Sequence, residues 1–365
     1  MAYKISGTKS EDARILVVRQ DTWEVEANTV ISGSGAYEVL GLTEGNKLVL
    51  GIADGGASVS YSSVDALLYL SSGDRGVFAG GYLSGNQNII DYITISTPAG
   101  SATNFGDLTV ARKDLSGASN GGYSKGVFAG GYSTYNTIDY ITITIPGDAS
   151  DFGDLAAARF DMGSTDNGAS NRALWAGGTY TPLCAIEYTT VNTNGNASGF
   201  GELSLCRYAL AGLSNDTQDR GVFVGGRSAP ASYINVIDYV TISTTGNAVN
   251  FGDLTLNRYG VAGTSDGANQ RGIIAGGVKA GPTDCNIIDY ITISSLGDAT
   301  DFGDLVTDNY YMASCSNKIN ERGIFAGGWT REDIIQYVTI NTLGNATHYN
   351  NLSSDRRELT GTSNA

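Results

Sequence analysis

Hydrophobic and polar residues alternate along a short segment that returns six times in the chain. In YITIS, which begins at Tyr92, every second residue is apolar. That period is typical of a strand with one buried face and one polar face. Copies of the segment begin at Ile89, Thr137, Ala185, Val236, Ile287 and Ile334. No long stretch of the chain has a convincing helical period, so the pattern predicts an all-β protein.

A second apolar segment, RGVFAGGY from Arg75, returns with the same rhythm. The second glycine of each pair stands at Gly81, Gly131, Gly178, Gly226, Gly277 and Gly328. Successive copies are 50, 47, 48, 51 and 51 residues apart. Periods near fifty are typical of β-propellers with four strands in each blade, and specifically of the kelch class. The sequence therefore predicts a six-bladed propeller.

Each unit divides into the same pieces. GVFAGG is followed by a variable loop, the YITIS strand, a turn such as GDAS or GNAS, and a segment such as NFGDL that we expect to be the outer strand. The last piece, such as ARKDLSGAS, is predicted to be the inner strand of the next blade. The C-terminal RRELTGTSNA matches that piece, so we expect it to complete the first blade and cover its open edge. DALLYLSSG, from Asp65, competes for the same place.

Glycine pairs and charged residues recur at fixed places, which favours a structural role. We expect the glycines to let neighbouring sheets approach closely. An acidic set and a basic set follow about five residues apart, and we interpret them as an Arg–carboxylate pair at each blade junction, with a catalytic acid as the alternative. The acidic set is Asp107, Asp154, Glu202, Asp253 and Asp304, with Asn351 in the last repeat, and the basic set is Arg112, Arg159, Arg207, Arg258 and Arg356 or Arg357, with Asn309 in repeat five.

The Asp-Tyr pairs of the repeats also look structural. They are Asp91-Tyr92, Asp139-Tyr140, Asp238-Tyr239 and Asp289-Tyr290, with Glu187 and Gln336 in the other two repeats. A metal site in every blade is the alternative, and Gln336 fits it poorly.

The first residues do not fit the repeat. We expect residues 1–64 to form a small β-sandwich domain and residues 65–365 to form the propeller. ARILVVRQ, WEVEANTVIS, AYEVLGL, NKLVLGIA and ASVSYSSV are predicted strands. The phrase GAYEVLGLTEGNKLVLGIA, from Gly35, resembles the small modules similar to carboxypeptidase regulatory domains. Such modules act as spacers or docking pieces, and an anchor to a larger assembly is the sharper hypothesis here.

Composition narrows the classes of partner. The net charge of −15 argues against nucleic acid, whose partners present clustered Lys and Arg. Four cysteines without a C-x-x-C pair and one histidine, His348, argue against a zinc site, and disulfides stay open. No apolar run is long enough to cross a membrane, and the N-terminus lacks the apolar region of a secretion signal. We expect no cofactor, no metal and no membrane insertion.

Residues 75–365 resemble kelch-like propellers. The phrase G-V-F-A-G-G, I-I-D-Y-I-T-I-S, G-N-A-x-x-F-G-D-L, A-R looks particularly like repeats in structural proteins of tailed bacteriophages. It departs from the eukaryotic kelch pattern, which has a Tyr and a Trp at fixed places after the glycine pair; here Trp329 is the only Trp in such a loop. The resemblance implies a virion component at a tail tip, fibre or capsid surface, assembled in the host cytoplasm and exposed on the particle.

The loops after the glycine pairs vary in length and sequence, which is where a constant scaffold usually binds ligands. They carry aromatic and basic residues suited to sugars or proteins. The candidate ligand-binding residues are Tyr82, Tyr132, Tyr135, Tyr180, Arg227, Tyr233, Lys279, Trp329 and Arg331.

We therefore expect a non-enzymatic receptor-binding protein, or adhesin, that recognises a host-surface glycan or protein and is held to other virion proteins through its N-terminal domain. A purely architectural tail, collar or capsid-decoration protein is the alternative. An enzyme is the third hypothesis, and the sequence argues against it. Kelch copper radical oxidases need two histidines, and no GxSxG, HExxH or phosphate-binding loop occurs. Sialidase-like propellers need an arginine cluster with a tyrosine nucleophile, whereas the arginines here sit at repeat positions.

Overall fold

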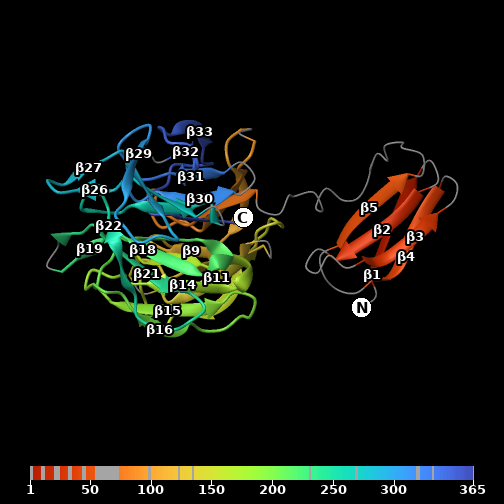
Figure 1. Cartoon of the computed structure of the whole chain (residues 1–365), viewed down its shortest axis with the longest axis horizontal. Coiled ribbons are helices and arrows are strands. Elements are labelled where there is room, and N and C mark those ends of the chain that lie inside the picture. Colours follow the sequence, from red (N-terminus) through yellow and green to blue (C-terminus); the bar gives the residue numbers. More distant parts are fainter. Residues whose placement is uncertain are drawn as a thin grey trace. The chain divides into compact units, whose positions relative to one another are not determined.

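The computed structural model divides the chain into two compact units, Met1–Ser71 and Ser72–Ala365, and each is described by itself (Figure 1). The predicted domain boundary at residues 64 and 65 and the segment from Asp65 lie outside the described residues. The structure describes residues 3–9, 13–19, 25–31, 35–42, 47–53, 74–97, 100–121, 124–133, 135–229, 232–267, 270–317, 321–330 and 333–364.

The first unit contains five described strands in two antiparallel sheets. One sheet pairs β1 (Tyr3–Lys9) with β4 (Gly35–Leu42). The other has the order β3 (Val25–Ile31), β2 (Ala13–Arg19) and β5 (Lys47–Ala53). Four of the predicted strands correspond to β2, β3, β4 and β5, and ASVSYSSV lies outside the described residues. β-Branched and leucine-rich runs such as ILVV explain the strands.

The second unit is built from six four-stranded antiparallel sheets, numbered here by their glycine pair. Sheet one is β34 (Thr360–Ser363), β6 (Arg75–Ala79), β7 (Ile89–Thr94) and β8 (Thr103–Asp107). Sheet two is β9 (Ser116–Ser119), β10 (Lys125–Ala129), β11 (Thr137–Thr142) and β12 (Ser150–Asp154). Sheet three is β13 (Gly163–Asp166), β14 (Arg172–Ala176), β15 (Ala185–Thr190) and β16 (Ser198–Glu202).

Sheets four to six repeat this order. Sheet four is β17 (Ala211–Ser214), β18 (Arg220–Val224), β21 (Val236–Thr241) and β22 (Val249–Asp253). Sheet five is β24 (Ala262–Ser265), β25 (Arg271–Ala275), β28 (Ile287–Thr292) and β29 (Thr300–Asp304). Sheet six is β30 (Ala313–Asn317), β31 (Arg322–Ala326), β32 (Ile334–Thr339) and β33 (Thr347–Asn351). The connecting segments also contain two-residue strands: β19 (Arg227–Ser228), β20 (Ser232–Tyr233), β23 (Arg258–Tyr259), β26 (Val278–Lys279) and β27 (Thr283–Asp284).

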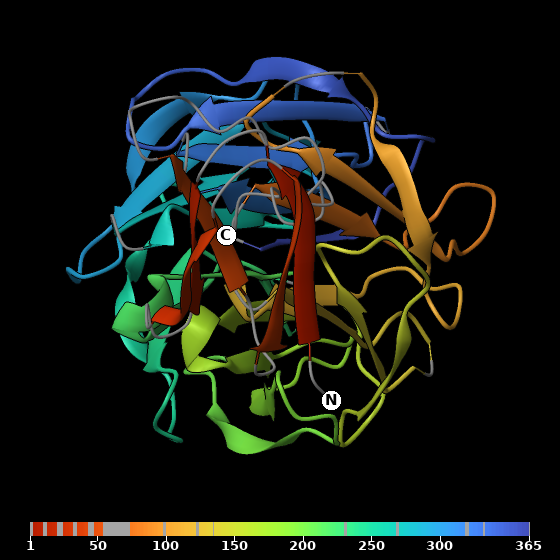
Figure 2. The same ribbon diagram turned by 90° about the vertical axis from the view of Figure 1, so that its right-hand side faces the viewer.

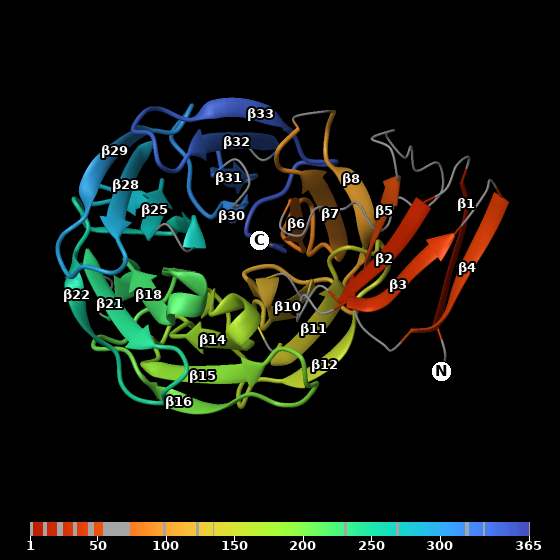
Figure 3. The same cartoon turned by 45° about the vertical axis from the view of Figure 1, so that its right-hand side comes forward.

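The sheets follow one another around a common centre. The colour of residues 72–365 passes in one circuit from orange through green to blue (Figure 2). The outer strands β12, β16, β22, β29 and β33 lie at the periphery (Figure 3). The innermost strands contact one another in the order β9, β13, β17, β24, β30 and β34, and β34 returns to β9. The all-β prediction is confirmed, and the arrangement is compatible with a propeller.

The C-terminal strand completes the first sheet, as the repeat predicts. β34 pairs with β6, so that Thr360 lies opposite Ala79 and Ser363 opposite Gly76. The two ends of the repeated region are thereby joined by main-chain hydrogen bonds.

The core lies between neighbouring sheets. Val77, Phe78 and Ala79 of β6 have no exposed surface, because they are covered on both faces. One apolar cluster joins Val77 of sheet one to Phe128 and Ile143 of sheet two, and each junction has a cluster of this kind. Continuous burial explains why GVFA lacks the alternation seen in YITIS.

The glycine pairs occupy positions that other residues would fill badly. Gly80 has a φ of +65°, and a Cβ there would lie 2.6 Å from the carbonyl oxygen of Arg112, which belongs to the next repeat piece. The expectation that these glycines permit a close approach of neighbouring segments is confirmed.

Candidate functional site

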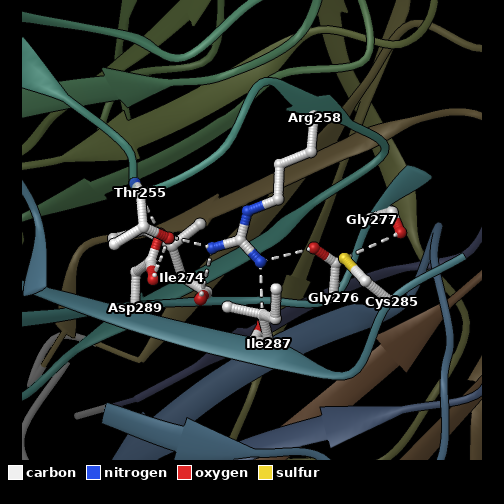
Figure 4. A network of polar contacts seen from close by, with 8 residues as sticks. All are labelled: Thr255, Arg258, Ile274, Gly276, Gly277, Cys285, Ile287 and Asp289. Carbon is white, nitrogen blue, oxygen red and sulfur yellow. Dashed lines mark hydrogen bonds and ion pairs between the residues drawn. The ribbon is translucent and has the colours of Figure 1, made fainter. Parts of the chain in front are cut away.

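The site is positioned by the recurrent arginines, whose partners differ from the prediction. Arg258 forms an ion pair of 2.8 Å with Asp289, the aspartate of the next Asp-Tyr pair, and both side chains are fully buried. The guanidinium also donates to the carbonyl oxygens of Gly276 and Ile287 (Figure 4). The same contact between successive repeats joins Arg112 to Asp139, Arg159 to Glu187, Arg207 to Asp238 and Arg356 to Asp91.

The acidic set is therefore wrong as the arginines' partner. Its members lie on the outer strands, where the amide of Asp107 donates to the Asp148 side chain of the neighbouring turn at 3.0 Å. The carboxylates that pair with arginine come instead from the Asp-Tyr segments, which confirms a structural role for that aspartate. The prediction relied on spacing along the chain, whereas the carboxylate that pairs with each arginine comes from the following sheet.

The departures of repeats five and six from the arginine–carboxylate pattern have one explanation. Asn309 stands where the other repeats have arginine, and Gln336 stands where they have a carboxylate. Asn309 donates to the carbonyl oxygen of Gly327 at 3.0 Å, and Gln336 accepts the amide of Val306 at 2.9 Å. Both charges are replaced at the same junction, so no buried ion is left unpaired there.

Two residues after each basic position, the chain turns sharply towards the centre. These six residues all have positive φ, between 52° and 65°. They are Asp114, Asp161, Ala209, Gly260, Tyr311 and Glu358. The backbone amide of each donates to the carbonyl oxygen of the corresponding residue in the preceding repeat, at 2.8 to 3.3 Å. The amide of Asp114 donates to Glu358, which closes a ring of six hydrogen bonds.

Three members of this ring are carboxylic acids that are almost fully buried: Asp114, Asp161 and Glu358. Burial, then the neighbouring Glu358, raises the pKa of Asp114 to about 7. Burial and the charge of Asp114 raise the pKa of Asp161 well above its usual range. The two aspartates hydrogen-bond to each other, so that the Asp161 carboxyl holds a proton that it donates to Asp114.

One lysine partly neutralises this group, which we call the carboxyl cluster. Lys113 Nζ lies 2.7 Å from Glu358 and 3.5 Å from Asp114. Burial lowers the pKa of Lys113, but the hydrogen bond to Glu358 and the charge of Asp114 outweigh it and leave that pKa raised. The lysine is therefore a permanent cation beside the cluster.

Around the carboxyl cluster, aromatic and basic side chains form a second ring, called here the aromatic ring. Six of its members follow the basic positions directly, six come from the loops after the glycine pairs, and Tyr311 stands two residues after Asn309. They are Tyr82, Lys113, Tyr132, Phe160, Tyr180, Tyr208, Arg227, Tyr233, Tyr259, Tyr310, Tyr311, Trp329 and Arg357.

One half of the aromatic ring runs from Tyr82 to Tyr208. Lys113 bridges Tyr82 and Tyr132, with Nζ 5.2 Å and 4.7 Å from the ring centroids. The centroids of Tyr132 and Tyr180 are 6.2 Å apart, and those of Tyr180 and Tyr208 are 5.5 Å apart. The Tyr180–Tyr208 pair is edge-to-face, a geometry that is favourable beyond the area it buries.

The other half of the aromatic ring runs from Tyr208 back to Tyr82. Tyr208 exchanges main-chain hydrogen bonds with Arg227, whose guanidinium lies 5.4 Å from the centroid of Tyr259. From Tyr259 the contacts pass through Tyr311 to Tyr310, which stacks on Trp329 with centroids 5.5 Å apart. Arg357 then lies 3.8 Å over the Trp329 ring and 5.1 Å from Tyr82, which completes the circle.

A cavity of about 250 Å³ opens inside the aromatic ring, with the carboxyl cluster among its lining residues. Tyr180 is 60% exposed and Trp329 is 40% exposed, so part of each side chain is accessible to solvent. Burial raises the pKa of the Tyr180 and Tyr310 hydroxyls to about 12, which keeps them neutral hydrogen-bonding groups. A second cavity of about 140 Å³ is lined by the same carboxyls and by residues of the innermost strands. The site thus offers stacking faces, neutral hydroxyls and buried acids to a ligand.

The structure brings six of the nine predicted binding residues into this aromatic ring: Tyr82, Tyr132, Tyr180, Arg227, Tyr233 and Trp329. Tyr135 lies instead beside Arg112, on which it acts electrostatically. Lys279 lies in β26, opposite Arg258 of β23. Arg331 lies outside the described residues.

The residues that follow the basic set, including the carboxyl cluster, are not among the binding residues predicted from the sequence. They stand in the segment predicted to form the inner strand, which looks structural. A signal was present, because the residue after the basic position changes from Lys to Phe, Tyr, Tyr, Tyr and Arg within an otherwise regular piece. Variation at one position of a regular piece indicates a candidate binding residue, as variation in a loop does.

A disulfide supports one side of the site. Cys184, in the loop that carries Tyr180, is bonded to Cys206, which stands two residues before Tyr208. The other two cysteines, Cys285 and Cys315, are free and buried. Burial raises the pKa of the Cys315 thiol, so it is unreactive.

Comparison of the sequence with models of known protein families finds no match. No curated protein matches the chain either. Within the described ranges, the His, Cys, Asp and Glu side chains form no group of three suited to a metal ion. The described part of the chain also has no helix long and apolar enough to cross a membrane.

Proposed function

We propose that residues 65–365 form a six-bladed kelch-like β-propeller whose aromatic ring binds a glycan on a cell surface. The single observation that carries the proposal is the closed circle of aromatic and basic side chains around an open cavity. Aromatic faces stack on sugar rings, and neutral tyrosine hydroxyls satisfy sugar hydroxyls without charge. The repeated architecture supports a scaffold whose variation is concentrated at this face.

The biological setting we propose is a virion. Residues 1–64, as a small β-sandwich, would hold the propeller to other virion proteins, and the aromatic ring would face the host. The repeat's resemblance to structural proteins of tailed phages supports this setting. A purely architectural role is the alternative, in which the cavity receives no ligand.

The protein acts, in this proposal, by binding alone. Glycosidases place two carboxyl groups at about 5 to 9.5 Å on either side of the bond that they cleave. Asp114 and Asp161 instead hydrogen-bond to each other, which leaves no room between them for a glycosidic oxygen. This arrangement supports a binding site rather than a pair of catalytic acids.

The test is a glycan array probed with the full chain and three variants. Trp329→Ala and Tyr180→Ala remove exposed stacking faces and should each weaken binding at least tenfold, as loss of one good stacking contact does. Tyr135→Ala is the matched control, since that tyrosine comes from a post-glycine loop but lies beside Arg112. Equal glycan binding by all four proteins would contradict the aromatic ring as the binding site, and no binding to glycans and host cells by the folded chain would favour the architectural alternative.

A further inference from the structure

We infer that the cavity inside the aromatic ring takes an organic ammonium group, carried as a substituent on the glycan. The inference rests on the proposed glycan-binding function and names the chemical feature that the site selects. A quaternary or protonated amine is held by aromatic faces on its sides and by carboxylates at its base.

The walls of the cavity have the composition that such a group requires. Tyr180, Tyr259, Tyr310 and Trp329 present aromatic rings to one space of about 250 Å³. A cavity of about 150 Å³ already accommodates a benzene molecule, so an ammonium with its methyl groups fits. The negative face of each ring attracts a cation within about 6 Å of its centroid.

Cations of the protein itself already use part of this surface. Lys113, Arg227 and Arg357 lie over tyrosine or tryptophan faces around the rim. Three cations of the chain thus lie against aromatic faces of the ring, whereas Tyr180, next to them, is bordered by the aromatic rings of Tyr132, Phe160 and Tyr208. That stretch of the lining is the place for a cation from outside.

The carboxyl groups at the base of the cavity supply the negative charge that complements a cation once one of them loses its proton. The Asp161 carboxyl donates a hydrogen bond to Asp114, and the groups facing the two aspartates are Glu358, Lys113, Tyr180 and Tyr311. Arg227 also lines the cavity but stacks on Tyr259 at the rim. An incoming cation would stabilise Asp114 as an anion, so that the proton that Asp114 holds below about pH 7 leaves to solvent while Asp161 keeps its own. Binding then releases about one proton in the pH range below the raised pKa of Asp114.

The experiment compares choline with its neutral isostere 3,3-dimethylbutan-1-ol, using the full chain in titration calorimetry. Choline keeps its charge at every pH, so any pH dependence belongs to the protein. At about pH 8 we expect choline to bind at least tenfold more tightly than the neutral isostere. The affinity for choline should fall about tenfold per pH unit below about pH 7. Heats in buffers of different ionisation enthalpy should show about one proton released below that pH.

Two variants locate the site. Asp161→Asn and Asp114→Asn keep the left-handed backbone, which asparagine adopts readily, so both should fold. Each should weaken choline binding at least tenfold and flatten its pH dependence. Asp107→Asn, the same change on an exposed outer strand, should leave both unchanged. Equal affinity for choline and the isostere, or an unchanged pH profile in the variants, overturns the inference.

The result is separable from the glycan proposal. Trp329-dependent binding to neutral glycans with no choline binding would retain the proposed function and contradict the ammonium inference. Phosphatidylcholine vesicles distinguish the source of the group. Co-sedimentation of the chain with the vesicles would overturn the assignment to a glycan, and a chain that stays in the supernatant while binding choline supports it.

Discussion

Arg356 forms an ion pair with Asp91 at 2.5 Å, and both side chains are fully buried. This pair joins the last basic position of the chain to the first Asp-Tyr segment, beside the pairing of β34 with β6. Side-chain and main-chain contacts therefore close the repeated region at the same place. Sheet six offers a natural comparison, because Asn309 and Gln336 replace both charges there.

Loss of one charge from this pair should be much more costly than loss of both. Arg356→Asn or Asp91→Gln leaves one buried ion without its partner, and we expect each to lower the free energy of unfolding by about 3 to 5 kcal/mol. The double variant recreates the neutral pair of Asn309 and Gln336 and should recover at least half of that loss. Urea denaturation of the three variants measures it, and a double variant as unstable as the sum of the singles would contradict it.

The carboxyl cluster should make stability depend on pH. The pKa of Asp114 is about 7 in the fold against 3.8 for an ordinary aspartate, so the folded state holds more protons between those values. Stability from this group is complete below about 3.8 and is lost as the pH rises through about 7. Asp114→Asn should therefore gain stability relative to the natural chain as the pH rises over that range. Urea midpoints at several pH values test this; a constant difference would be contrary evidence.

The first glycine of a pair should not tolerate a side chain. Gly80→Ala places a Cβ 2.6 Å from the carbonyl oxygen of Arg112 at a φ of +65°. We expect a loss of more than about 1 kcal/mol, since both the backbone angle and the contact are unfavourable. Gly85→Ala is the control, because a Cβ there meets nothing within 4 Å. Thermal unfolding of both variants shows the difference, and equal melting temperatures would be inconsistent with crowding at the pair.

The disulfide should stabilise the side of the site that carries Tyr180. Cys184 and Cys206 are 22 residues apart, and a bridge closing a loop of that size contributes roughly 3 kcal/mol. Cys184→Ser with Cys206→Ser should lower the melting temperature and weaken ligand binding, whereas the Trp329 side of the ring keeps its contacts. A reducing agent should reproduce the effect on the natural chain but not on the double variant. Indifference of the natural chain to reduction would show that the bridge contributes nothing.

Much of the fold follows from the sequence, because the repeat makes the same local choices six times. The alternation in YITIS predicts β7, and the match between RRELTGTSNA and the inner-strand pieces predicts the pairing of β34 with β6. Partners across a junction do not follow from spacing. Arg112 was assigned to the nearby Asp107, but the packing of successive sheets brings Asp139 to it.

The candidate site was predictable only in part. Tyr132, Tyr180 and Trp329 stand in loops whose variation marks them, whereas Asp114 and Asp161 stand in a piece that looks like scaffold. Asp114 and Asp161 come together because the residue two places after each basic position has a positive φ and belongs to the ring of main-chain hydrogen bonds. Neither feature is visible in composition or hydrophobic period, since both arise only when residues of different repeats come together in the folded chain.

Hydrogen–deuterium exchange with saturating choline, on the full chain, tests most directly whether the aromatic ring is the ligand site. The account predicts slower exchange in the segments around residues 113–114, 160–161, 310–311 and 329–330, which carry the aromatic ring and the carboxyl cluster. The turns at Leu296 and Leu343, which join the two outer strands of sheets five and six, should exchange as before. Protection confined to those turns or to residues 1–53, or no protection anywhere, would contradict the account.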